Sequence, residues 1–132
     1  MGAVGSVDVE LLLISWLQTR LGNDVVVRDE LDNRLLDELP TVQVTVVGGG
    51  DDGFRLDRAL VDVDVYAGTR AGAIALAAEI HGALLGELRG ATTSTAVVGR
   101  LDTVSRPSAR PYENTGLRRV GATYQLYSHP VS

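Results

Sequence analysis

The chain has 132 residues, 45% of them hydrophobic, which is enough for one packed domain spanning residues 1–132. Its formal net charge of −5 argues against a dedicated nucleic-acid binder, whose contact surface is normally basic. The absence of cysteine excludes a disulfide framework and a thiolate metal site.

Neither membrane insertion nor secretion is expected. The longest apolar run, residues 73–78, is far shorter than the ~20 residues that a membrane span needs. Residues 1–5 contain no basic residue, which argues against a secretory signal.

Charge is distributed unevenly along the chain. Residues 1–67 hold thirteen acids and five arginines, whereas residues 68–132 hold four acids and seven arginines. Two solvated surfaces would explain this, and so would complementary faces between neighbouring copies.

The first predicted element is a helix over residues 7–21. Its apolar residues have helical spacing: Val9, Leu12, Leu13, Trp16 and Leu17. We expect Ser6 to cap its start, Asp8 and Glu10 to favour its N-terminal dipole, and Gly22 to end it. Trp16 is interpreted as a core anchor.

Three strands are predicted next. Residues 25–27 form a short one, and the charged segment 28–40 makes one or two helical turns before Pro40. Residues 41–47 and 59–66 alternate apolar and polar side chains, and we expect them to form a hairpin around GGGDDG.

Thr69 is the expected N-cap of a second helix, over residues 70–88. Its predicted packing face comprises Ile74, Ala77, Ala78, Leu84 and Leu85. Strands near residues 95–104 and 117–127 follow, separated by a loop in which Pro107 and Pro111 oppose strand pairing. The pattern predicts an α+β fold with a mainly antiparallel sheet and two helices, in the order helix, strands, helix, strands.

The stretch VVGGGDDGF, residues 46–54, matches the dinucleotide-binding pattern G-x-G-x-x-G. That function requires a helix to begin at the glycines and direct its amides at a pyrophosphate. A strand is predicted here instead, and Asp51 and Asp52 would repel the phosphates. The stretch is therefore interpreted as a hairpin, and no cofactor is predicted.

Asp62 and Asp64 form a D-x-D whose carboxylates share one face of a strand. Such a pair can hold Mg²⁺ for phosphoryl or glycosyl chemistry, but no third ligand lies nearby in sequence. An amphipathic strand facing water, a channel or a neighbouring subunit is the preferred interpretation.

No catalytic group is predicted. His81 and His129 belong to no metal or triad motif, and Ser94 lacks a nucleophile-elbow context. We therefore expect the protein not to be an enzyme.

Five arginines lie between residues 100 and 119: Arg100, Arg106, Arg110, Arg118 and Arg119. They are interpreted either as a solvated loop or as a contact surface for an acidic protein, which suits the negative chain better than DNA does.

Three segments together resemble one protein family: ELPTVQVTVVG, LVDVDVYAGTRAGAIALAAEIHGALL and RPYENTGLRRVGATYQLY. Their order, with a preceding helix, is similar to that of the tail-terminator (tail-completion) proteins of long-tailed bacteriophages. The resemblance spans nearly the whole chain, although the length of the glycine-rich hairpin is not matched to the family, and no catalytic motif defines the group.

The resemblance implies a structural virion protein. It would form a ring, as a hexamer, on the head-proximal end of the tail tube, stop tube polymerisation and join the tail to the head connector. Its partners would be further copies, the tail tube protein and the connector protein, with DNA as non-specific cargo through the lumen. It would be located at the head-tail junction of the virion, and in the host cytoplasm during assembly.

Charge adds residue-level expectations. Asp51, Asp52, Asp62 and Asp64 are expected to face the channel or a neighbour, and Arg106, Arg110, Arg118 and Arg119 an adjacent subunit or ring. The alternatives left open are a head-tail stopper or adaptor ring, a metal-dependent enzyme using Asp62 and Asp64, and a DNA-binding module using the arginines.

Overall fold

The computed structural model describes residues 7–51, 56–112 and 116–131. Five strands form one sheet in the order β1-β2-β3-β5-β4, antiparallel except for the parallel pair β1–β2. The elements are α1 (Val9–Leu21), β1 (Val26–Arg28), η1 (Leu35–Asp37), β2 (Thr41–Asp51), β3 (Asp57–Ala67), α2 (Arg70–Ala83), η2 (Leu84–Leu88), β4 (Ala96–Arg110) and β5 (Arg118–Pro130). The α+β class and the order of elements are confirmed.

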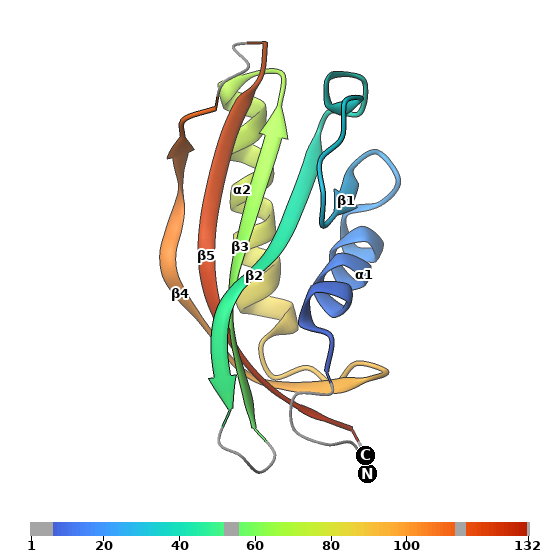
Figure 1. Cartoon of the computed structure of the whole chain (residues 1–132), viewed down its shortest axis with the longest axis vertical. Coiled ribbons are helices and arrows are strands. Elements are labelled where there is room, and N and C mark those ends of the chain that lie inside the picture. Colours follow the sequence, from blue (N-terminus) through green and yellow to red (C-terminus); the bar gives the residue numbers. More distant parts are fainter. Residues whose placement is uncertain (1–6, 52–55, 113–115, 132) are drawn as a thin grey trace.

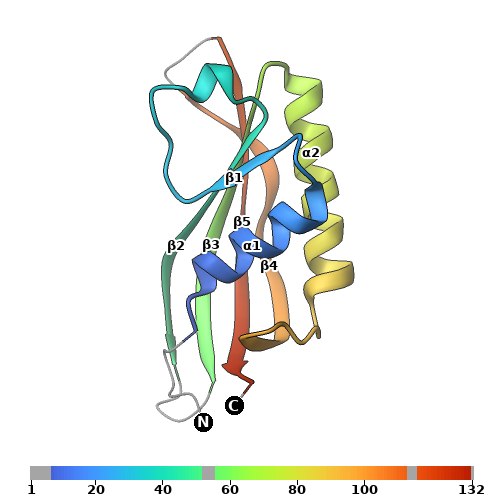
Figure 2. The ribbon, with the colours of Figure 1, turned by 90° about the vertical axis from the view of Figure 1, so that its right-hand side faces the viewer.

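Both helices cover the same face of the sheet (Figures 1 and 2). Helix α1 lies against β1 and β2, and α2 lies against β3, β5 and β4. Alternation along the strands directs valines into this layer, including Val44, Val61 and Val63, where they pack with Leu13 and Leu17 of α1. On the opposite face, neither α1 nor α2 covers the sheet, and Leu35 of the short helix η1 packs with Tyr66 and Leu117 at one end.

The helix ends confirm two predicted caps and revise one. Gly22 ends α1 with φ 86°, and the Thr69 hydroxyl accepts from the Gly72 amide at 3.0 Å at the start of α2. Asp8 caps α1, because its carboxylate accepts from the Leu11 amide at 3.0 Å. Ser6, the predicted cap, lies outside the described residues.

Trp16 is not the core anchor that was predicted. It is only partly buried, whereas Leu13 and Leu17 fill the core beneath α1. Apolar residues occur around most of α1, so spacing alone did not show which of them face the sheet.

The packing face of α2 is also corrected. Ala77 and Leu84 are buried as predicted and Leu85 is half-buried, but Ile74 and Ala78 are exposed. Five further residues are buried instead: Ala73, Ile80, Ala83, Leu88 and the preceding Ala67. In this alanine-rich helix, adjacent faces differ little in hydropathy, so the pattern did not define the rotation about the helix axis.

The segment Arg70–Leu88 is long and apolar enough to span a membrane by length and composition, with a mean hydropathy of 1.3. About a third of that window is buried within the protein, against the sheet. Packing as a core helix accounts for the same apolar composition.

The β2–β3 hairpin is longer than predicted. Strand β2 continues through the glycines, pairing Gly48 with Leu60 and Gly49 with Ala59 after an irregularity at Val47. Gly49 has φ 146°, a conformation that favours glycine.

Strand β4 also extends further than predicted, through residues 105–110, which were expected to form a loop. Pro107 is tolerated because β4 is the edge strand and its register shifts between Ser105 and Ser108. The predicted break at this proline is therefore wrong.

Candidate functional site

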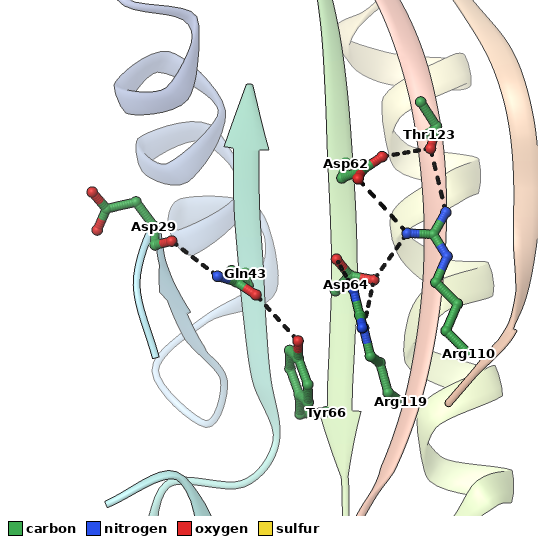
Figure 3. Close-up of polar contacts among 8 residues, drawn as sticks. All are labelled: Asp29, Gln43, Asp62, Asp64, Tyr66, Arg110, Arg119 and Thr123. Atoms are coloured by element: carbon green, nitrogen blue, oxygen red, sulfur yellow. Dashed lines mark hydrogen bonds and ion pairs between the residues drawn. The ribbon is translucent and has the colours of Figure 1, made fainter. Parts of the chain in front are cut away.

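A polar cluster occupies the sheet face opposite the helices. Asp62 and Asp64 of β3 lie there together, as their spacing predicted, beside Thr123 of β5 and two arginines (Figure 3). We call Asp62, Asp64, Arg110, Arg119 and Thr123 the sheet-face cluster.

Asp64 is the centre of this cluster and is only 3% exposed. Arg119 donates from Nε to Oδ1 and from Nη2 to Oδ2, both at 3.1 Å. Arg110 donates from Nη1 to Oδ1 at 3.2 Å. This bidentate pairing compensates the buried carboxylate, and the Asp64 contact raises the pKa of Arg119 above its ordinary value.

Asp62 is bound less tightly than Asp64. The Thr123 hydroxyl donates to Asp62 Oδ1 at 2.5 Å, and Arg110 Nη1 lies 3.9 Å from Oδ2. Arg110 Nη2 donates to the Thr123 hydroxyl at 3.3 Å, which joins both aspartates in one network. Its two acids and two arginines carry no net formal charge.

Tyr66 extends the polar face towards β2. Its hydroxyl donates to Gln43 Oε1 at 3.1 Å, and Gln43 Nε2 donates to the Asp29 carbonyl oxygen at 3.2 Å (Figure 3). The Tyr112 ring meets the Tyr66 ring edge to face at 5.2 Å between centroids. Burial raises the pKa of Tyr66 to about 12, so the hydroxyl is a proton donor at physiological pH.

The cluster does not resemble a metal site. Both aspartates are engaged by guanidinium groups, and the described ranges contain no group of three His, Asp or Glu side chains that would hold an ion. The arrangement can hold β3, β5 and the end of β4 together, but it presents no ligand set to Mg²⁺.

The other predicted site residues lie apart from the cluster. Asp51 is exposed at the end of β2, Arg106 is exposed on β4, and Asp52 is outside the described residues. Arg118 is exposed and donates to the Leu117 carbonyl oxygen at 3.3 Å. The structure thus brings Arg110 and Arg119 together with Asp62 and Asp64, and their roles at an interface stay predictions.

The glycine-rich stretch has the strand geometry that argues against a phosphate site. Strand β2 runs through Gly50 and strand β3 begins at Asp57.

His81 Nδ1 lies 2.8 Å from the Tyr124 hydroxyl, which makes it a packing residue of α2 and β5.

Sequence reasoning missed three parts of the site. Thr123 and Gln43 carry hydrogen bonds, and Gly121 leaves space for Asp64. Gly121 and Thr123 flank Ala122 in an alternating strand, so the alternation could have placed both on the same face of the sheet. It could not have identified their partners, which come from distant segments of the chain.

Comparisons with known proteins place the fold. No family model and no curated protein matches the chain. Among solved structures, it is similar to a chain from "Virion of native gene transfer agent (GTA) particle", with a TM-score of 0.56 and 20% sequence identity. The match covers 91% of this chain and 89% of that one. At this identity the likeness shows a shared fold.

Proposed function

We propose that this protein is a structural virion protein that forms a ring on the head-proximal end of a phage tail tube. The ring, a hexamer, ends tail polymerisation and joins the tail to the head connector. The observation that carries the proposal is the fold shared, over nearly the whole chain, with a chain of a gene transfer agent virion. The sequence resemblance to tail-terminator proteins supports the finer assignment.

The polar chemistry of the chain supports a structural role. Asp62 and Asp64, which offered an enzymatic interpretation, are bound by Arg110, Arg119 and Thr123. In this role their function is to hold β3, β5 and the end of β4 together, and turnover of a substrate is not part of it.

The charge of the sheet-face cluster is compatible with DNA passing through the ring. A surface whose acids and arginines are paired within one subunit neither binds phosphates strongly nor repels them strongly. Asp51, Asp52, Asp62 and Asp64 were predicted to face the channel or a neighbouring subunit; within one subunit Asp64 is 3% exposed and bound by arginines, so it would add little charge to the lumen surface.

Deletion of the gene from the genome that encodes the particle tests this function. We expect overlong tails or tails that fail to join heads, and restoration of both by the wild-type gene supplied in trans. Tails of normal length together with infectious or transfer-competent particles would contradict the proposal.

Electron microscopy separates the terminator from a head-tail stopper or adaptor, the alternative ring proteins. A tag at the C-terminus would label the protein in the images. A terminator ring is expected directly on the last ring of the tube. Density on the portal side, separated from the tube by another ring, would assign it to the connector instead.

A further inference from the structure

Helix α1 presents an apolar surface that the described residues leave uncovered. Leu11 is 59% exposed, and Ile14 and Trp16 are only partly buried. A groove of about 900 Å³ runs beside Leu11 and Trp16, towards residues 93–95. Helices that are apolar on most sides are normally buried, so this surface is suited to contact with another protein. We call Val7, Leu11 and Trp16 the α1 surface.

A second apolar surface lies between α2 and β4. Ile74, 40% exposed, and the exposed Ala78 line a groove of about 540 Å³ with Pro107 and Ala109. These four residues form the α2–β4 surface. Both residues of α2 were predicted from the sequence to be packed, and the sheet does not cover them.

The two surfaces lie at opposite ends of the helix formed by α2 and η2. The groove of the α1 surface reaches Glu87 in η2 and residues 93–95 before β4, whereas the groove of the α2–β4 surface is lined by Arg70 to His81 and by residues 106–109 at the end of β4; α1 itself lies over β1 and β2 (Figures 1 and 2). Two different surfaces on one protomer suit a head-to-tail arrangement, in which each copy uses both.

Their charged rims have opposite sign. Asp8 and Glu87 line the groove of the α1 surface, and Arg20 there is already paired with Glu87 at 2.9 Å. Arg70 and Arg106 line the groove of the α2–β4 surface, and neither makes an ion pair within residues 7–51, 56–112 and 116–131. This complementarity favours contact between copies of the chain.

We propose that the α1 surface of one copy docks onto the α2–β4 surface of the next copy. This inference rests on the proposed ring-forming function and identifies the contact that builds the ring. Leu11 and Trp16 are the apolar anchors, which pack against Ile74 and Pro107 of the neighbour. Arg70 and Arg106 lie around that contact and face the Asp8 side of the neighbouring copy. Because the two surfaces differ, the contact is heterologous, and its repetition gives a ring where the rotation between neighbours closes.

The absence of native cysteine makes site-specific crosslinking a direct test. We would make Leu11→Cys, Ile74→Cys and the double variant, and treat concentrated purified protein and assembled particles with a short bis-maleimide. The double variant is expected to give a ladder of covalent oligomers. Leu11→Cys mixed with Ile74→Cys is expected to give dimers, and each alone none.

The control pairs Ile74→Cys with Leu36→Cys, because Leu36 is 53% exposed but belongs to neither surface. Crosslinks in that pair equal to those of the Leu11 pair, or dimers of Leu11→Cys alone, would overturn the head-to-tail contact. Absence of the ladder from both purified protein and particles would also overturn it.

Substitution to glutamate gives a second readout. Leu11→Glu is expected to lower incorporation into particles at least tenfold, with the circular dichroism spectrum and thermal midpoint of the monomer retained. Leu36→Glu is expected to be incorporated normally. Equal incorporation of both would contradict the contact.

Different results would reject the proposed ring-forming function and the proposed contact between copies. A ring located on the tail without the Leu11–Ile74 crosslink would reject this contact and leave the proposed function standing. A crosslinked ladder from purified protein, together with particles whose tails contain none of the protein, would support the contact and reject the function.

Discussion

Gly121 and Asp64 face each other across the β3–β5 ladder, and the space that a Gly121 side chain would fill is occupied by the Asp64 carboxylate. The Arg110 guanidinium is also close, with its Nε and Nη1 both 2.7 Å from the position of a Cβ. The glycine therefore allows a carboxylate and a guanidinium to meet over the sheet.

Gly121→Ala is expected to destabilise the protein by about 1–3 kcal/mol, the usual cost of overpacking a filled site. The displaced carboxylate would also lose hydrogen bonds to Arg119. Urea unfolding measures the free energy change. Gly99→Ala is the matched control, because Gly99 also lies in a strand and a Cβ there meets nothing within 4 Å. Equal effects of the two substitutions would contradict this explanation.

Asp64→Asn is expected to cost about 1.5–3 kcal/mol, since it removes the charge that binds two arginines at a buried position. Asp62→Asn is expected to cost clearly less, because that side chain is 27% exposed and its nearest guanidinium nitrogen is 3.9 Å away. The unfolding free energies of both variants provide the comparison. A larger loss for Asp62→Asn would show that the centre of the cluster was misassigned.

Gly49→Ala is expected to destabilise the hairpin by more than about 1 kcal/mol, since φ is 146° and a Cβ would overlap the Arg58 carbonyl. At Gly48 the nearest atom to a Cβ is Leu60 Cδ1 at 3.6 Å, so Gly48→Ala is expected to be tolerated. Hydrogen exchange of β2 and β3 amides would locate the effect. Similar exchange in the two variants would argue against a specific requirement at Gly49.

Alkaline pH is expected to lower stability through two buried tyrosines. Burial raises the pKa of Tyr66 and of Tyr124 to about 12, above the ordinary value of 10.0. The folded state therefore retains these protons longer, so the stabilisation is complete below about pH 10 and is lost as pH rises towards 12.

Urea midpoints measured from about pH 9 to about pH 11 should therefore fall, and fall less steeply in the Tyr66→Phe and Tyr124→Phe double variant. The slope with pH is the relevant quantity, because each substitution also removes a hydrogen bond. An unchanged slope would show that other groups cause the alkaline loss.

The sequence predicted the sheet well because alternation in β2 and β3 is regular, and Asp62 and Asp64 were placed together by the same period. It did not predict the continuation of β4 through Pro107. A proline ends a strand only where a ladder hydrogen bond is needed, and whether a strand lies at the edge depends on the whole topology.

The contacts within the sheet-face cluster could not be predicted from the sequence, for a related reason. Asp64 meets Arg110 and Arg119, which lie 46 and 55 residues away in the chain. Period two shows which face a side chain occupies, but the strand order β3-β5-β4 decides which arginines share it. The five arginines between residues 100 and 119 therefore suggested a charged surface, whereas two of them, Arg110 and Arg119, bind Asp64 within the fold.

The irregular path of β4 has a consequence for the protein at high concentration. Its outer edge is interrupted by Pro107 and by three shifts of register, between Val98 and Arg100, Thr103 and Ser105, and Ser105 and Ser108. Such an edge presents no continuous row of amide and carbonyl groups to template further chains. The protein is thereby protected along this border from fibril growth by strand addition, even when many copies accumulate together.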